Sequence, residues 1–215
     1  MPPATPAIPS NVAEPSHEPA PTGRWADRLR AEFLAAAQDL GDDVGEPGEL
    51  AFHPDRTWHG YTYIPVSATT STDYQLYGYV RFVAGTDGRD QGDFSAYADF
   101  TEETPERNPD WTLDLCDEVV GSWHGDGDAL ASMTLVWGRA LVTGGAVATA
   151  ELGETTVDQC QLAGDRFTLL AADDYADELL EVRLYTQAGE EIARESLYDD
   201  DDDDDDTAES HAAPS

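Results

Sequence analysis

The chain has 215 residues, with 45 acidic side chains against 11 arginines or lysines, so its formal net charge is −34. Such a charge repels phosphate backbones and anionic lipid surfaces, and we therefore expect no direct nucleic-acid partner and no membrane partner. All eleven of these basic side chains are arginines. The absence of lysine excludes a Walker A phosphate loop, a pyridoxal Schiff base and a lysine general base.

The two ends of the chain have compositions that cannot form a hydrophobic core. Residues 1–23 are rich in proline and alanine, and residues 199–215 begin with eight consecutive aspartates that repel one another. We predict that both ends are disordered and that residues 24–198 form a single folded domain. This domain still carries 34 acidic side chains against the eleven arginines, a net charge of −23, so we expect a protein partner to be basic.

Residues 24–40 have the clearest helical pattern, and Gly41 follows them as a stop signal. Apolar side chains recur there at steps of three and four and lie on one face: Trp25, Leu29, Phe33, Ala36, Ala37 and Leu40. This narrow stripe predicts an amphipathic helix that docks on its own domain. The helix also holds the only local cluster of positive charge, so an acidic tail that folds back would contact Arg24, Arg28 and Arg30.

From residue 52 onward the hydrophobic period changes to two. Residues 58–66 and 74–83 are rich in aromatic and β-branched side chains and predict a hairpin. Short alternating segments separated by glycine-containing turns continue to residue 198. About ten short strands at this spacing predict an all-β fold, an antiparallel sandwich with the N-terminal helix packed against it.

Aromatic side chains are concentrated in the first predicted hairpin. Tyr61 and Tyr63 share one strand face, and so do Tyr77 and Tyr79, so cross-strand pairing would merge them into one patch. We define the aromatic patch, a candidate partner-binding surface, as Trp58, Tyr61, Tyr63, Tyr77 and Tyr79. An exposed patch of this kind would bind a sugar, a proline-rich segment or a partner protein; the alternative is that these tyrosines favour strands and line the rim of the core.

Short loops of aspartate and glycine can offer oxygen ligands to Ca²⁺. Asp126 and Asp128 form such a loop and are the candidate metal ligands. The spacing does not match an EF-hand, because Leu130 occupies the fifth position, where an oxygen ligand is needed. We expect no other cofactor.

Catalytic motifs give no candidate residue. The segment 121–125 (GSWHG) does not match the G-x-S-x-G pattern of serine hydrolases. Cys116 and Cys160 are interpreted as ordinary thiols in a reducing compartment, because residues 1–23 lack the basic and apolar regions of a secretory signal. The pattern therefore predicts a cytoplasmic, non-catalytic binding or accessory protein that engages a basic partner through the aromatic patch, the acidic tail or both. Two alternatives stay open: a divalent-metal-binding protein or metal-dependent enzyme that uses acidic loops, and a structural subunit of a larger assembly.

Overall fold

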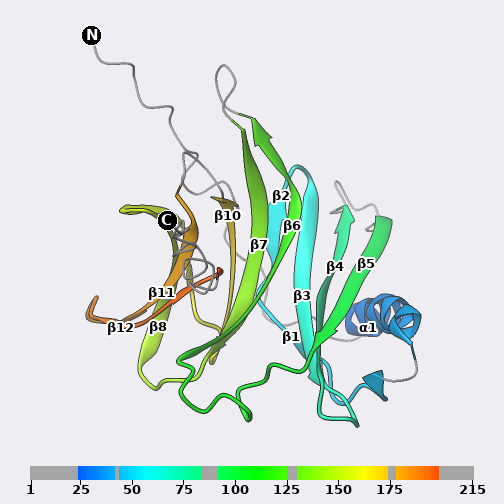
Figure 1. Cartoon of the computed structure of the whole chain (residues 1–215). Helices are drawn as coiled ribbons and strands as arrows, with labels where there is room; N and C mark the ends of the chain where they lie inside the picture. Colours follow the sequence, from blue (N-terminus) through cyan, green and yellow to red (C-terminus); the bar gives the residue numbers. More distant parts are fainter. Residues whose placement is uncertain (1–23, 42–43, 84–91, 125–129, 174–177, 199–215) are drawn as a thin grey trace, which may run out of the picture.

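The computed structural model describes residues 24–41, 44–83, 92–124, 130–173 and 178–198, and these are mostly antiparallel strands (Figure 1). Helix α1 (Arg24–Ala37) continues into a 3₁₀ turn, η1 (Gln38–Leu40), over the range where the sequence predicts a helix. The predicted all-β fold with one N-terminal helix is confirmed. Among the described residues, no helix is long and apolar enough to cross a membrane. The predicted disordered ends lie outside the described residues.

The described strands form three sheets, one more than a simple sandwich has. The helix-side sheet has the order β1-β3-β4-β5, with β2 also paired to β3; its strands are β1 (Ala51–Phe52), β2 (Arg56–Trp58), β3 (Tyr61–Thr69), β4 (Gln75–Val83) and β5 (Gly92–Thr101). The middle sheet has the order β10-β7-β6; its strands are β6 (Leu113–His124), β7 (Leu130–Ala140) and β10 (Arg166–Asp173). The outer sheet has the order β12-β11-β8-β9; its strands are β8 (Gly145–Leu152), β9 (Thr155–Gln161), β11 (Leu180–Thr186) and β12 (Glu191–Ser196).

Helix α1 covers one face of the helix-side sheet (Figure 1). Leu29 and Phe33 from the predicted apolar stripe are fully buried in the cluster between the helix and this sheet, where the helix lies over β4 and β5. The facing side chains come from alternate strand positions, because successive side chains point to opposite faces of a sheet. They are Ile64, Val66, Ala68, Leu76, Val80 and Phe82. The opposite face of the same sheet therefore carries the tyrosines.

The middle sheet lies between the other two sheets (Figure 1), and its strands β7 and β10 are buried on both faces over most of their length. Consecutive residues of β7, such as Leu135, Val136 and Trp137, are all fully buried, and so are consecutive residues of β10, such as Leu169 and Leu170. Strands buried on both faces are apolar without alternation. This explains why their runs lack the period of two that is evident in β4.

Candidate functional site

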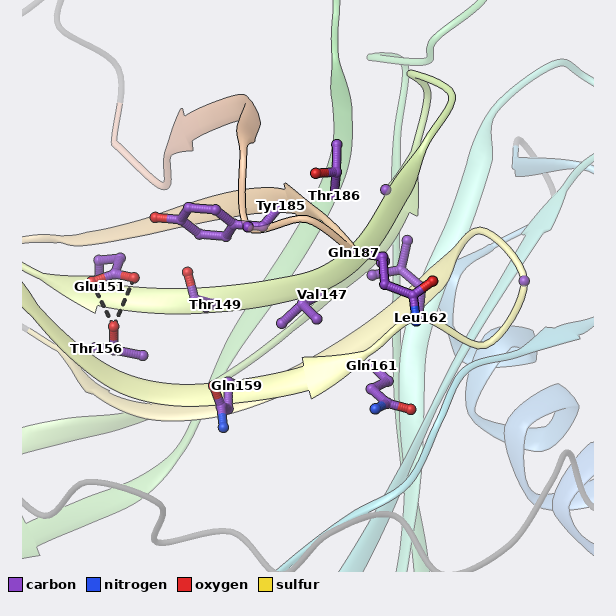
Figure 2. Close-up of a pocket in the computed structure, with 14 residues that line it drawn as sticks. Val147, Thr149, Glu151, Thr156, Gln159, Gln161, Leu162, Tyr185, Thr186 and Gln187 are labelled. Carbon is purple, nitrogen blue, oxygen red and sulfur yellow. Dashed lines mark hydrogen bonds between the residues drawn. The ribbon is translucent and has the colours of Figure 1, made fainter.

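A polar groove of about 550 Å³ lies on the face of the outer sheet that points away from the core (Figure 2). Strand β8 forms its floor, where Val147, Thr149 and Glu151 line the groove. The residues between them, Ala148 and Ala150, are fully buried in the core. This alternation follows from the pleat of the strand, and it divides β8 into an apolar face and a polar face. The size is that of sites that bind small molecules or short chains.

A hydrogen-bonded pair occupies one end of the groove. The hydroxyl of Thr156 on β9 lies 2.9 Å and 3.0 Å from the two carboxylate oxygens of Glu151, to which it donates (Figure 2). Glu151 is only 5% exposed. Burying a carboxylate is costly unless it is hydrogen-bonded, so Thr156 stabilises the carboxylate in this position.

Thr149, in the middle of the floor, is 6% exposed, and its hydroxyl oxygen has no hydrogen-bond partner among the described residues. In Figure 2 this oxygen points toward the side of the groove where the ring of Tyr185 lies. Most buried polar groups in proteins are paired, and an unpaired one costs about 1–3 kcal/mol. Because the oxygen itself is buried, a neighbouring side chain must shift before a ligand hydroxyl in the groove can supply the missing partner.

Side chains that both donate and accept hydrogen bonds form the walls. Gln159 and Gln161 come from β9, where their backbones pair with Thr149 and Val147. Tyr185 comes from β11 on the other side, paired with Val147. Thr186 and Gln187 close the end beyond Tyr185. No arginine, lysine or histidine lies among the described residues of the lining, but Arg183 and Glu181 of β11 pair with Thr149 and Glu151 of β8 and form an ion pair of 2.9 Å on the same face of the sheet.

The structure brings the residues of the aromatic patch together, but on a face that points into the molecule. Tyr79 pairs with Pro65 and Tyr97, and the rings of Tyr63 and Tyr79 meet edge to face at 5.5 Å between centroids. Tyr63 is only 2% exposed. The Tyr77 ring lies 6.3 Å from that of Trp137 in the middle sheet.

Strand β6 passes over this face, so the patch is an interface between two sheets. The indole of Trp58 lies against Gly121 of β6, where a side chain would overlap it. Burial, followed by the nearby carboxylate of Asp99, raises the pKa of Tyr77 to about 12. The expectation of an exposed patch does not fit Tyr63, and the other four residues are half-buried. The sequence left two interpretations open, and this burial matches the one in which the tyrosines line the rim of the core.

The remaining predicted site residues are only partly described. Arg28 pairs with Glu32 and stacks over the ring of Phe94 at 4.9 Å, and Arg30 is exposed. The Arg24 side chain and the aspartate tail lie outside the description, so the tail contact stays a prediction. Asp126 and Asp128 also lie outside the described residues. Within the described ranges, no three histidine, cysteine, aspartate or glutamate side chains converge as a metal site.

A second cavity, of about 150 Å³, lies where the helix-side and middle sheets meet, and its lining includes Ser67, Arg139 and Arg166. Ser67 Oγ is 3.1 Å from Nε2 of the buried His53. Burial, followed by the charge of Arg166, lowers the pKa of His53 to about 3. An imidazole with this pKa is a weak base, so the pair is poorly suited to activate Ser67 as a nucleophile.

Comparison with family models, with curated proteins and with solved structures found no match, so the groove is interpreted from its own geometry alone. None of the residues singled out from the sequence as candidates lines this groove. Its signal is the segment 147–151 (VATAE), in which larger or polar side chains alternate with alanine. Such alternation predicts a strand with one buried face and one polar face, but not that neighbouring strands add glutamines and a tyrosine beside it.

Proposed function

We propose that this protein is a non-catalytic binding module whose ligand occupies the groove on the outer sheet. The observation that carries the proposal is the Thr149 hydroxyl, which is buried at the floor of an open groove without a partner. Its cost to the folded state is offset when a ligand hydrogen-bonds to it. The volume of about 550 Å³ supports the same reading.

Binding fits the chemistry of the lining better than catalysis does. Acid–base hydrolysis commonly uses two titratable groups on opposite sides of the reacting bond. The described lining has one carboxylate, Glu151, and no second carboxylate or histidine to act with it. Amides and hydroxyls make up most of the rest, and these groups orient a ligand without exchanging protons with it at neutral pH.

The test is a binding screen against immobilised oligosaccharides and peptides with the full chain and two variants. Val147→Trp fills the middle of the groove from the polar face of β8, where the new ring does not enter the core. Val119→Trp, on β6 at a side chain that is 54% exposed, is the matched control. We expect a ligand that binds the wild type and the Val119→Trp variant but not the Val147→Trp variant. If no ligand is found, or if Val147→Trp retains all binding, the proposal fails.

A basic protein partner is a second candidate, which is supported by the net charge of −23 between residues 24 and 198 and by the eight aspartates that follow. Pull-downs that compare the full chain with a chain ending at Tyr198 test it. Recovery of the same partners, or of none, with both chains would exclude the acidic tail as a binding arm.

A cytoplasmic location belongs to the same proposal. Cys116 on β6 and Cys160 on β9 are both free, as expected in a reducing compartment. The metal-dependent and structural alternatives remain predictions. Calorimetry with Ca²⁺ tests the first, and sedimentation of the purified chain tests the second.

A further inference from the structure

We infer that the ligand of the groove is a neutral saccharide chain, bound by stacking on Tyr185 and by hydrogen bonds to the floor of β8 and the amides of β9. The inference rests on the proposed function, because it names the ligand class for the same site. Three properties of the described lining support it: its hydrogen-bonding character, its charge and its shape.

The hydrogen-bonding groups match those of a sugar. A sugar hydroxyl both donates and accepts, and so do the side chains that surround the Thr149 hydroxyl. The amides of Gln159 and Gln161 lie on one side of it and the hydroxyl of Tyr185 on the other (Figure 2). A ligand with many hydroxyls would satisfy the Thr149 hydroxyl while exchanging hydrogen bonds with both walls.

The charge of the lining disfavours ionic ligands. The described lining has no basic side chain to hold an anion, and the net charge of the chain repels one. A cation would use the Glu151 carboxylate, which accepts only the single proton of the Thr156 hydroxyl. Arg183 of β11 is also near: the hydrogen bonds with Glu181 and Tyr185, and to a smaller extent the charge of Glu151, raise the pKa of Arg183. The guanidinium of Arg183 already offsets part of the charge that a cation would use.

The shape suits a chain and not a single ring. The groove follows β8 from Gly145 to Glu151, about 20 Å at the usual rise of a strand. The aromatic ring of Tyr185 lies along this path (Figure 2). The apolar C–H face of a pyranose ring stacks on such a ring, while its hydroxyls point sideways to polar groups.

The first experiment titrates the full chain with the strongest saccharide from the screen and measures the dissociation constant by calorimetry. Thr149→Val removes the floor hydroxyl and keeps the shape, and we expect binding to weaken about tenfold. Thr168→Val is the matched control, since the Thr168 hydroxyl is also buried without a described partner but lies in the core. This control should bind within about twofold of the wild type.

The ring is tested in the same way. Tyr185→Leu should weaken binding about tenfold or more, whereas Tyr185→Phe, which keeps the ring, should stay within about threefold. Raising the salt concentration from about 0.05 M to 0.5 M should change the affinity for a neutral ligand less than about twofold, because screening acts on charge pairs.

An arginine-containing peptide is the contrasting probe. If it binds in the groove with strong salt dependence, is lost in Val147→Trp and Glu151→Gln, and no saccharide binds, the saccharide inference is wrong while the proposed function stands. If neither class of ligand distinguishes Val147→Trp from Val119→Trp, both fail. Saccharide binding that is equally strong in Thr149→Val and Tyr185→Leu would also overturn the inference, because it would place the ligand elsewhere.

Discussion

Arg56 on β2 and Asp158 on β9 form a buried ion pair that joins the helix-side sheet to the outer sheet, with Nε and Oδ2 3.3 Å apart. The two side chains are 3% and 4% exposed. Asp158 also accepts the backbone N–H of Leu170 on β10 at 2.8 Å. Arg56 in addition donates to the backbone carbonyl of Gln159 at 3.2 Å. The pair therefore holds β9 in the position from which the Gln159 side chain lines the groove.

Breaking this pair should be strongly destabilising. Burial raises the pKa of Asp158 although Arg56 acts in the opposite direction, so the carboxylate depends on its partners. We expect Asp158→Asn or Arg56→Met to lower the free energy of unfolding by about 3–5 kcal/mol, because each leaves a buried group uncompensated. The combined Arg56→Met/Asp158→Leu variant should be more stable than either single variant. Urea unfolding measures the free energy of unfolding of all three variants. A loss below about 1 kcal/mol in each single variant would contradict the role given to the pair.

His53 should make folding sensitive to acid. Its pKa falls from 6.5 to about 3 in the folded chain, mainly because it is buried. The unfolded chain therefore binds an extra proton in this range, so the stabilising contribution is fully present above pH 6.5 and is lost as the pH falls toward 3. In this window the stability of the wild type should fall more steeply than that of His53→Gln, by up to about 1.4 kcal/mol per pH unit. Parallel curves for the two proteins from pH 7 to pH 4 would show that His53 does not titrate as described.

The contact between Trp58 and Gly121 gives a test of how the two sheets meet. A methyl group at position 121 would overlap the indole, so Gly121→Ala should destabilise the fold by about 1–3 kcal/mol. Trp58→Leu shortens the opposing side chain. Gly121→Ala should therefore lower the free energy of unfolding less in the Trp58→Leu variant than in the wild type. If chemical unfolding shows that the free-energy changes of the two substitutions simply add, the two residues are not in contact.

The Thr149 hydroxyl should oppose stability in the absence of ligand. Replacing it with a methyl group in Thr149→Val removes an unpaired buried oxygen, and we expect the free energy of unfolding to rise by about 1 kcal/mol. Thr168→Val should behave likewise, since its hydroxyl is in the same state. A marked loss of stability in Thr149→Val, measured by thermal and urea unfolding, would show that the hydroxyl is paired in solution.

The sequence predicts those features that depend on local periodicity. The stripe that contains Leu29 and Phe33 identifies the helix, and the alternation in 74–83 identifies β4. It also predicts that Tyr63 and Tyr79 share a face, because this follows from antiparallel pairing.

The orientation of that face depends on contacts distant in sequence, and the sequence does not predict it. Strand β6 packs over the tyrosines, and nothing within the 58–83 hairpin signals this. The groove also depends on contacts between residues distant in sequence. Strand β11 pairs directly with β8, although β10 of the middle sheet lies between them along the chain. Polar residues at Thr149, Gln159 and Tyr185 become a site only when the order of the strands is known.

Mapping of backbone amide shifts by NMR during a saccharide titration shows most directly whether the polar face of the outer sheet binds the ligand. We predict that the amides of Thr149, Gln159 and Tyr185 shift in a saturable way, while those of Tyr63 and Tyr79 in the sheet interface stay unchanged. Shifts confined to β3 and β4, or the absence of any saturable shift in β8, β9 and β11, would contradict the account.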